Sequence, residues 1–214
     1  MKTKTKAAAP VRVMLVDDHT SFRQGLTALM AGEPDLKVVA EAGDGKTALE
    51  QYRQKRPDVV LMDLRLPGMG GVEITLVIRK EFPDARIIVL TTFETDEDIY
   101  RAIQSGAKSY LLKDTPYPEI ARTVRQVHAG EQILPPKIAS LLAQRQQRDD
   151  LSQRELSILE LLVKGRSNKE IGSSLSIAED TVKTHLKNLF AKLGVSDRTG
   201  AAITAIKHGI IHLE

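Results

Sequence analysis

Short apolar runs alternate with amphipathic segments over the first 130 residues of the chain. Uninterrupted apolar runs are typical of strands buried on both faces of a parallel sheet, and apolar residues three and four positions apart are typical of covering helices. The predicted strands are 11–16, 36–40, 59–62, 86–90 and 109–112, and the predicted helices are 21–30, 47–54, 72–80, 96–105 and 119–128. This alternation predicts a doubly wound α/β domain with a five-stranded parallel sheet.

Polar side chains with related chemistry follow four of these strands, namely Asp17-Asp18, Asp63, Thr91 and Lys113. Because the carboxyl ends of parallel strands share one edge of a sheet, we expect these groups to converge. Several carboxylates at one place favour a hard divalent cation, and Mg²⁺ leaves room for water and a phosphate oxygen. A carboxylate can also act as a nucleophile and form an aspartyl phosphate.

Each of these residues has a structural reading when it is taken alone. Asp17 and Asp18 could cap a helix, Thr91 could end a strand and Lys113 could be solvated. None of these readings explains why four strand ends carry such groups together, so the pattern favours a functional site. Within the first helix, we expect the following residues to form the inward stripe: Phe22, Leu26, Leu29 and Met30.

The last 64 residues, 151–214, have a helical pattern throughout. Ser152 to Glu155 and Ser167 to Glu170 match the capping box that opens a helix. A short helix around 171–175, a turn and a longer helix over 181–193 form the helix-turn-helix pattern. The outer face of 181–193 carries Lys183, Thr184, Lys187, Asn188 and Ala191, with Lys192 flanking them. His185 is open to three readings, namely packing, contact with a phosphate, or base reading. A plain helical bundle with a basic solvated face remains the alternative.

Residues 131–150 differ from both halves, since they are polar and weakly patterned. Pro135-Pro136 interrupts the helix before them, and Ile138, Leu141 and Leu142 allow one or two helical turns. We therefore predict an interdomain linker over 131–150, between a domain of residues 11–130 and one of 151–214. Residues 1–10, with Lys2, Lys4 and Lys6, are predicted to be a disordered basic tail.

Composition narrows the function classes. The chain of 214 residues is 42% hydrophobic and 28% charged, as in globular proteins, and is long enough for two small domains. It has no apolar run near the roughly 18 residues that a membrane span needs and no signal peptide, so we expect a cytoplasmic protein without membrane contact. The absence of cysteine excludes disulfides, thiolate metal sites and cysteine nucleophiles.

The net charge of +3 is unevenly distributed. Residues 11–130 hold 16 basic and 18 acidic residues (16 − 18 = −2), and residues 151–214 hold 9 and 7 (9 − 7 = +2). Any contact with DNA must therefore come from a local cationic cluster. An aromatic content of 4% without Trp argues against base-stacking platforms for single strands.

The first half resembles the receiver domain of two-component response regulators. The resemblance rests on Val-Asp-Asp-His at 16–19, Met-Asp-Leu-Arg-Leu-Pro-Gly-Met-Gly-Gly at 62–71, Leu-Thr-Thr-Phe at 90–93 and Gly-Ala-Lys-Ser-Tyr-Leu-Leu-Lys at 106–113. It implies a flavodoxin-like strand order, 2-1-3-4-5, with Asp63 as the phosphoacceptor. It also implies that Mg²⁺ is held by Asp18, Asp63 and the Arg65 carbonyl beside Asp17, and that the switch and phosphate-binding residues are Thr91, Tyr110 and Lys113.

The second half resembles the LuxR-type DNA-binding domain, the usual companion of a receiver in the NarL/FixJ family. The matching segments are Leu-Ser-Gln-Arg-Glu at 151–155, Gly-Arg-Ser-Asn-Lys-Glu-Ile at 165–171 and Thr-Val-Lys-Thr-His-Leu-Lys-Asn-Leu at 181–189. By this resemblance the helix over 181–193 enters the major groove, and the helix around 201–206, with small residues on one side, is similar to the family's dimerising helix. The candidate DNA-binding residues are Lys183, Thr184, His185, Lys187 and Asn188.

Two positions depart from the family pattern. Ala178 stands where a Ser or Thr cap is expected, and losing such a cap costs about 1 kcal/mol. Gly172 replaces a small alanine in the second helix, and we expect a further cost of about 1 kcal/mol from its low helix propensity.

The sequence thus predicts a phosphorylation-dependent transcriptional regulator and not a turnover enzyme. A sensor histidine kinase would phosphorylate Asp63, and the homodimer would bind double-stranded promoter DNA. One alternative is a phosphatase-like hydrolase that uses an aspartyl phosphate, although Arg65 stands where its second acid is expected. Another is a receiver that acts only through protein docking, with a helical domain that does not bind DNA.

Overall fold

The computed structural model describes residues 9–212. Residues 1–8, which hold most of the predicted basic tail, and residues 213–214 lie outside the described residues. Contacts between residues divide the chain into two units, one built from the chain up to Glu94 with 101–139, and the other from 95–100 with 140–214. In the described part, no helix combines the length and apolarity that a membrane crossing requires.

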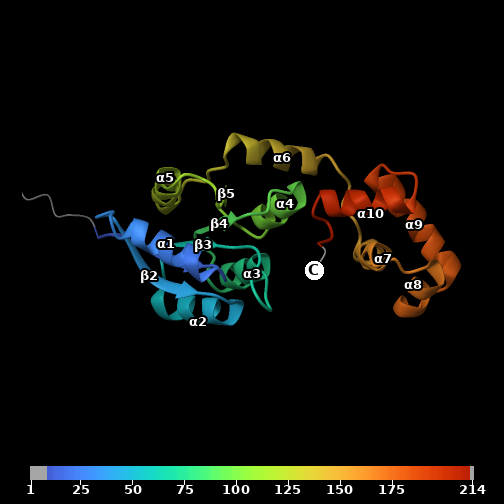
Figure 1. The fold of residues 1–214 in the computed structure, drawn as a ribbon, viewed down its shortest axis with the longest axis horizontal. Coiled ribbons are helices and arrows are strands. Elements are labelled where there is room, and N and C mark those ends of the chain that lie inside the picture. Colours follow the sequence, from blue (N-terminus) through green and yellow to red (C-terminus); the bar gives the residue numbers. More distant parts are fainter. Residues whose placement is uncertain (1–8, 213–214) are drawn as a thin grey trace, which may run out of the picture. The chain divides into compact units, whose positions relative to one another are not determined.

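The first unit contains a single parallel sheet (Figure 1). Its strands are β1 (Val11–Val16), β2 (Leu36–Ala42), β3 (Val59–Met62), β4 (Ile87–Thr91) and β5 (Ser109–Leu112). Every neighbouring pair is parallel, and the order is β2-β1-β3-β4-β5. Both the predicted fold class and the predicted strand order are confirmed.

Helices follow the strands in alternation: α1 (Thr20–Met30), α2 (Gly45–Lys55), α3 (Gly71–Glu81), α4 (Asp96–Gln104) and α5 (Tyr117–His128). Alternate strand residues supply two core clusters, so that Leu15 packs with α1 and α5 whereas Met14 packs with α2 and α3. The predicted stripe of α1 is too wide, because the Leu29 side chain is 51% exposed. Leu26 and Met30, one turn apart, are the residues that α1 buries.

The remaining helices are α6 (Pro136–Gln146), α7 (Gln153–Val163), α8 (Asn168–Leu175), α9 (Glu179–Leu193) and α10 (Arg198–Lys207). The expectation of one or two turns in the linker is too short, because α6 has 11 residues. Pro136 opens this helix, since the first turn of a helix needs no amide donor from proline. Ser152 and Ser167 form the predicted capping boxes of α7 and α8 with Glu155 and Glu170.

The last four helices share one hydrophobic core. Its fully buried members include Ile158 of α7, Ile171 of α8, Val182 and Leu189 of α9, and Ala205 of α10. In α9, Leu186 lies between Val182 and Leu189 at a spacing of four and three residues, which places all three on one face. The opposite face of α9 is left exposed to solvent.

Candidate functional site

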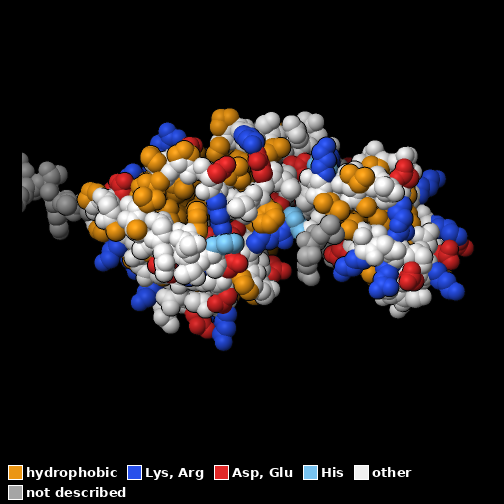
Figure 2. All heavy atoms as spheres, in the orientation of Figure 1, with side chains coloured by type: hydrophobic (Ala, Val, Ile, Leu, Met, Phe, Trp, Pro, Cys, Tyr) orange, Lys and Arg blue, Asp and Glu red, His pale blue; other side chains and the backbone are white. Residues whose placement is uncertain are grey.

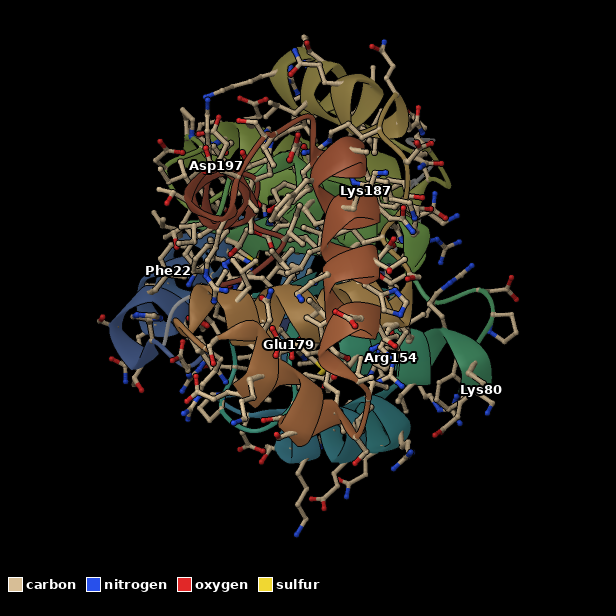
Figure 3. The ribbon with its side chains drawn as sticks, turned by 90° about the vertical axis from the view of Figure 1, so that its right-hand side faces the viewer. Phe22, Lys80, Arg154, Glu179, Lys187 and Asp197 are labelled. Carbon is tan, nitrogen blue, oxygen red and sulfur yellow. The ribbon has the colours of Figure 1, made fainter. Side chains whose placement is uncertain are left out.

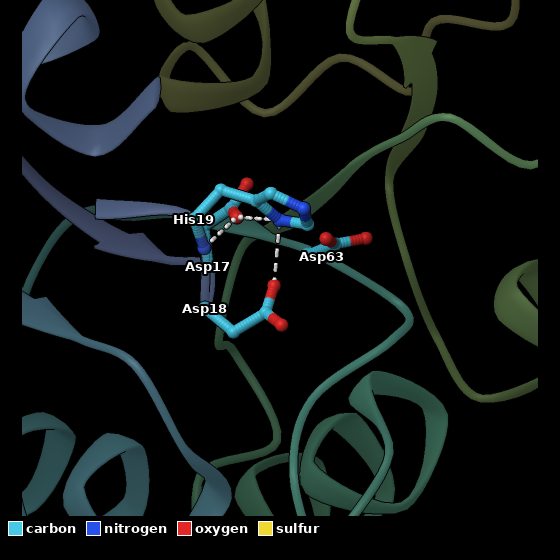
Figure 4. Close-up of side chains that lie close together, drawn as sticks. All are labelled: Asp17, Asp18, His19 and Asp63. Atoms are coloured by element: carbon cyan, nitrogen blue, oxygen red, sulfur yellow. Dashed lines mark hydrogen bonds and ion pairs between the residues drawn. The ribbon is translucent and has the colours of Figure 1, made fainter. Parts of the chain in front are cut away.

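Two strand ends place the acidic residues of the first unit. The Asp17 amide, just beyond β1, donates to the Ala42 carbonyl at 3.0 Å, and the Asp63 amide, just beyond β3, donates to the Val16 carbonyl at 2.8 Å. The sheet thus holds both backbones at its carboxyl edge. Ligand atoms from Asp17, Asp18, His19 and Asp63 all lie within 4.8 Å of one another (Figure 4).

Lys113 reaches this cluster from the end of β5. Its Nζ lies 2.6 Å from Oδ2 of Asp17 and 2.7 Å from Oδ2 of Asp63, and its side chain is 10% exposed. Burial alone lowers the pKa of Lys113, but the hydrogen bonds to Asp17 and Asp63 outweigh burial and leave that pKa raised. The ammonium also lies 5.0 Å from the centroid of the Phe22 ring, within cation–π range.

Three carboxylates, those of Asp17, Asp18 and Asp63, meet at this edge of the sheet. The Lys113 ammonium contacts two of them, Asp17 and Asp63. Burying carboxylates without compensation is costly, and a hard divalent cation that prefers oxygen ligands would neutralise the remainder. The donor chemistry therefore fits such an ion.

His19 is a member of this cluster that the sequence analysis did not select. Its Nδ1 lies 2.7 Å from Oδ1 of Asp18 and 3.2 Å from Oδ1 of Asp17, and its amide donates to the same Asp17 oxygen at 2.8 Å. The signal available in the sequence was its position directly after Asp18.

Of the other predicted switch residues, Thr91 ends β4 and Tyr110 lies within β5. Thr91 is fully buried, and its Oγ1 lies 3.5 Å from the Phe93 amide. The Tyr110 ring is also fully buried, with its hydroxyl donating to the Phe93 carbonyl at 2.7 Å. The Arg65 amide lies 3.4 Å from Oδ1 of Asp63, while its guanidinium stacks 4.5 Å from the Phe93 ring centroid. Phe93 thus touches all three residues.

In the second unit, the turn between α8 and α9 brings two backbone segments together. Ser176 has a left-handed conformation with φ of 55°, and the Ile177 amide donates to the Gly172 carbonyl at 2.9 Å. A Cβ on Gly172 would lie 2.7 Å from the Ile177 carbonyl oxygen. The expectation that glycine here only costs stability is therefore wrong, because a larger residue would separate α8 from the turn. Ala178 precedes α9 without a side-chain cap, as predicted.

The exposed face of α9 is less uniformly cationic than its sequence indicates. The helix begins at Glu179, not Thr181, and Nζ of Lys183 lies 2.9 Å from Asp180 and 3.7 Å from Glu179. These carboxylates raise the pKa of Lys183, with the Asp180 hydrogen bond as the largest cause. Figure 2 shows acidic side chains among the Lys and Arg side chains of the second unit.

Lys187 and Lys192 have opposite surroundings although both are on α9. Lys187 is exposed and has no acidic partner among residues 9–212, and Figure 3 labels it on the same helix as Glu179. Lys192 instead turns toward α7, where its Nζ lies 2.9 Å from Oε2 of Glu155. Thr184 and Asn188 are exposed and His185 is half-buried. Lys192 is therefore unsuited to flank the outer face as predicted.

The small residues of α10 do not form an external face. Ala201 and Ala205 are fully buried in the helical core, whereas Ile203 and Ile206 are 59% and 40% exposed. The two alanines fit against α7 and α9 within one chain, so the small side of α10 is buried, and a role of this helix in dimerisation stays a prediction.

The model of the response regulator receiver domain matches residues 13–125, and that of the luxR family of bacterial regulatory proteins matches residues 149–205. The transcriptional regulatory protein LiaR of Bacillus subtilis is 42% identical over 210 residues, covering 94% of this chain and 100% of LiaR. The chain belongs to the response regulators with a LuxR-type DNA-binding domain. The response regulator protein VraR of Staphylococcus aureus is a further relative, 39% identical over 206 residues, with 94% of this chain and 99% of VraR covered.

Solved structures of response regulators share this architecture. The crystal structure of ChrA, from a haem-sensing two-component system, is 38% identical and has a TM-score of 0.57 over 95% of this chain and 100% of ChrA. A structure of an RcsB–DNA complex has a TM-score of 0.67 at 23% identity, over 91% of this chain and 97% of the RcsB chain. At 23% identity, the likeness to RcsB supports only the fold of this chain.

Proposed function

We propose that this response regulator accepts a phosphoryl group on Asp63 from a sensor histidine kinase and thereby changes its affinity for promoter DNA. The observation that carries the proposal is the buried contact of Lys113 Nζ with Asp63 beside two further carboxylates. An oxygen of Asp63 would form a bond to phosphorus while the bond from phosphorus to the kinase imidazole breaks. The chain would thus be a regulator that is phosphorylated once and not a turnover enzyme.

The residues around Asp63 would position and neutralise the phosphoryl group. Asp17, Asp18, Asp63 and the Arg65 carbonyl would hold Mg²⁺, which when bound supplies positive charge to the phosphoryl oxygens. Lys113 already contacts Asp63, and its ammonium would pair with the negative charge that the phosphoryl group adds. Thr91 would donate its hydroxyl to a phosphoryl oxygen.

Movement at Thr91 would be transmitted through Phe93 and Tyr110. The Phe93 amide lies next to the Thr91 hydroxyl, and the Phe93 carbonyl accepts the Tyr110 hydroxyl. A displacement of Thr91 toward the phosphoryl group would therefore remove the hydrogen bond that holds the Tyr110 ring inside. Such a local change biases an equilibrium between two conformations.

The exposed face of α9 is our candidate DNA-reading surface. Lys187, which has no acidic partner among residues 9–212, would contribute a cation. Thr184 and Asn188 would contribute hydrogen bonds, and His185 would contact a phosphate. Lys183 would first have to exchange its acidic partners for DNA. Two such surfaces in a homodimer would read two half-sites.

Both steps can be tested on the full chain with acetyl phosphate, Mg²⁺ and selected genomic fragments. Asp63→Asn should abolish labelling and the phosphate-dependent gain in DNA binding. Lys187→Ala should weaken binding and reduce its dependence on salt, because one phosphate contact is lost. Lys192→Ala is the matched control in the same helix and should keep the salt dependence. Labelling of Asp63→Asn, or unchanged binding by Lys187→Ala, would contradict the respective step.

A further inference from the structure

A polar cavity of about 460 Å³ lies at the amino edge of the receiver sheet, opposite to the edge that carries the acidic cluster. β4 and β5 begin at this cavity, and the last turns of α3 and α5 border it. Its volume is in the range of cavities that hold small ligands. Its charged lining consists of Arg79, Arg86 and Lys108 together with Asp84 and Glu131.

The sheet fixes the positions of two of the three cations. Arg86 directly precedes β4, and its carbonyl accepts the Val60 amide at 2.9 Å. Lys108 directly precedes β5, and its amide donates to the Ile87 carbonyl at 2.7 Å. Because β4 and β5 are neighbours in the sheet, both side chains reach the same cavity, and both are half-buried there.

The third cation, Arg79, is held in place by backbone groups. Its guanidinium donates to the carbonyl oxygens of Pro83 and Ala85, the second at 3.2 Å. Gly106 leaves the space that this side chain needs, since a Cβ at Gly106 would lie 2.8 Å from Nε of Arg79. Gly106 also has a φ of 102°, which favours glycine. The backbone thus holds the Arg79 guanidinium in place without a carboxylate.

These cations gather without being neutralised by the protein. Among residues 9–212, no carboxylate forms an ion pair with Arg79, Arg86 or Lys108. Asp84 and Glu131 are exposed, so water and salt screen their charges. Cations held close together and half out of water repel one another, and a bound anion would remove that repulsion.

We propose that this cavity binds a small molecule that carries two or more phosphate groups. Guanidinium groups form paired hydrogen bonds with phosphate oxygens, and the Lys108 ammonium adds a point charge. Three cations match about three negative charges, which a diphosphate group supplies and a single carboxylate does not. The site is separate from Asp63 and does not depend on its phosphorylation. A ligand that binds only the folded receiver would stabilise it and thereby give this response regulator a second chemical input.

Calorimetric titration of the full chain with inorganic pyrophosphate tests the site, without Mg²⁺ so that the acidic cluster cannot hold the anion through a metal ion. Arg86→Gln and Lys108→Gln should each weaken pyrophosphate binding about tenfold or more, because each removes a charge-assisted hydrogen bond. Lys37→Gln is the matched control, since it removes one positive charge from an exposed position of β2, and the affinity should stay within about twofold. Lys108→Gln should keep the labelling of Asp63 by acetyl phosphate and Mg²⁺, which shows that the receiver is folded.

Absence of saturable pyrophosphate binding below about 10 mM would overturn the inference. An equal loss in Lys37→Gln would also overturn it, because the effect would then come from net charge and not from the cavity. Tighter binding of citrate than of pyrophosphate would overturn the choice of phosphate as the recognised group. Asp63→Asn should bind pyrophosphate as the original chain does, so failure of the proposed phosphorylation would leave this site intact. A loss of binding in Asp63→Asn would instead place the anion at the acidic edge and overturn the inference.

Discussion

The two units of this response regulator handle charge in opposite ways. In the receiver, Lys113 is nearly buried and contacts an aspartate 50 positions earlier in the chain. On α9, Lys183 is 56% exposed and pairs with an acid three positions away. The first arrangement requires a complete sheet, whereas the second requires one helix. The comparison indicates that the chemistry of the receiver is coupled to its stability, while the charges on the exposed face of α9 are free to exchange partners.

The largest effect is expected when the buried contacts of Lys113 with Asp17 and Asp63 are removed. Lys113→Met should lower the free energy of unfolding of the receiver by about 3 kcal/mol, because Asp17 and Asp63 would keep their buried charges without a cation. Hydrogen exchange of β1, β3 and β5 peptides in urea measures this loss. Lys183→Met should leave the protection of the α9 peptides unchanged. Similar losses in the two variants would remove the contrast between the units.

A smaller effect is expected at the α8–α9 turn. Gly172→Ala should destabilise the helical unit by about 2 kcal/mol, because the added Cβ meets the Ile177 carbonyl and the backbone must move. Urea unfolding followed by the hydrogen exchange of α8 measures this change. Gly25→Ala is the matched control in α1, where a Cβ would meet nothing within 4 Å, and it should stabilise the receiver by about 1 kcal/mol. A stabilised Gly172→Ala variant would show that the turn can open without cost.

The ion pair between the buried Glu155 and the partly exposed Lys192 should make the stability of the helical unit depend on pH. Burial alone raises the pKa of Glu155, but the hydrogen bonds from Lys192 and Ser152 outweigh it and leave that pKa lowered. A lowered folded-state pKa contributes stability above the unfolded value of about 4.3, and this contribution is lost as the pH falls through the folded pKa. Glu155→Gln should therefore cost about 1.5 kcal/mol near neutral pH.

The same variant supplies its own control in acid. As the pH falls below the unfolded pKa and then through the lowered folded pKa, the difference between Glu155→Gln and the original chain should shrink, because the carboxyl group becomes protonated in both folded and unfolded chains. Urea unfolding near neutral pH and in acid tests the sign. A difference that grows in acid would contradict the lowered pKa.

The smallest expected effect sharpens the view that α9 is a locally determined helix. Ala178→Ser should stabilise the helical unit by about 1 kcal/mol, because a serine hydroxyl can accept one of the free amides at the start of α9. Ser152→Ala, which removes the cap of α7, should cost a similar amount. Thermal unfolding measures both, and an unchanged midpoint for Ala178→Ser would mean that the cap cannot form beside the turn.

Sequence reasoning recovered most elements because their signals are local. Runs such as Val59–Met62 and the capping boxes at Ser152 and Ser167 depend on neighbouring residues only. Sequence reasoning was less reliable where the exposure of a side chain or the close approach of two backbone segments decides the structure. The exposed Leu29, the extended helix α6 and the backbone contact at Gly172 all depend on what lies opposite in space, which spacing along the chain does not reveal.

By itself, the sequence determined the order of strands and helices and the family. It also singled out one set of site residues, namely Asp17, Asp18, Asp63 and Lys113. Both were possible because apolar periodicity and polar strand ends can be read from neighbouring residues. Only the tertiary structure decided that Lys113 is shared between Asp17 and Asp63 and that His19 joins them. It also decided that Lys192 turns inward while Lys187 keeps no acidic partner in the part of the chain that the structure describes. The physical reason is that ion pairing and burial depend on distances between side chains far apart in the chain, and these distances exist only once the sheet and the helical core have formed.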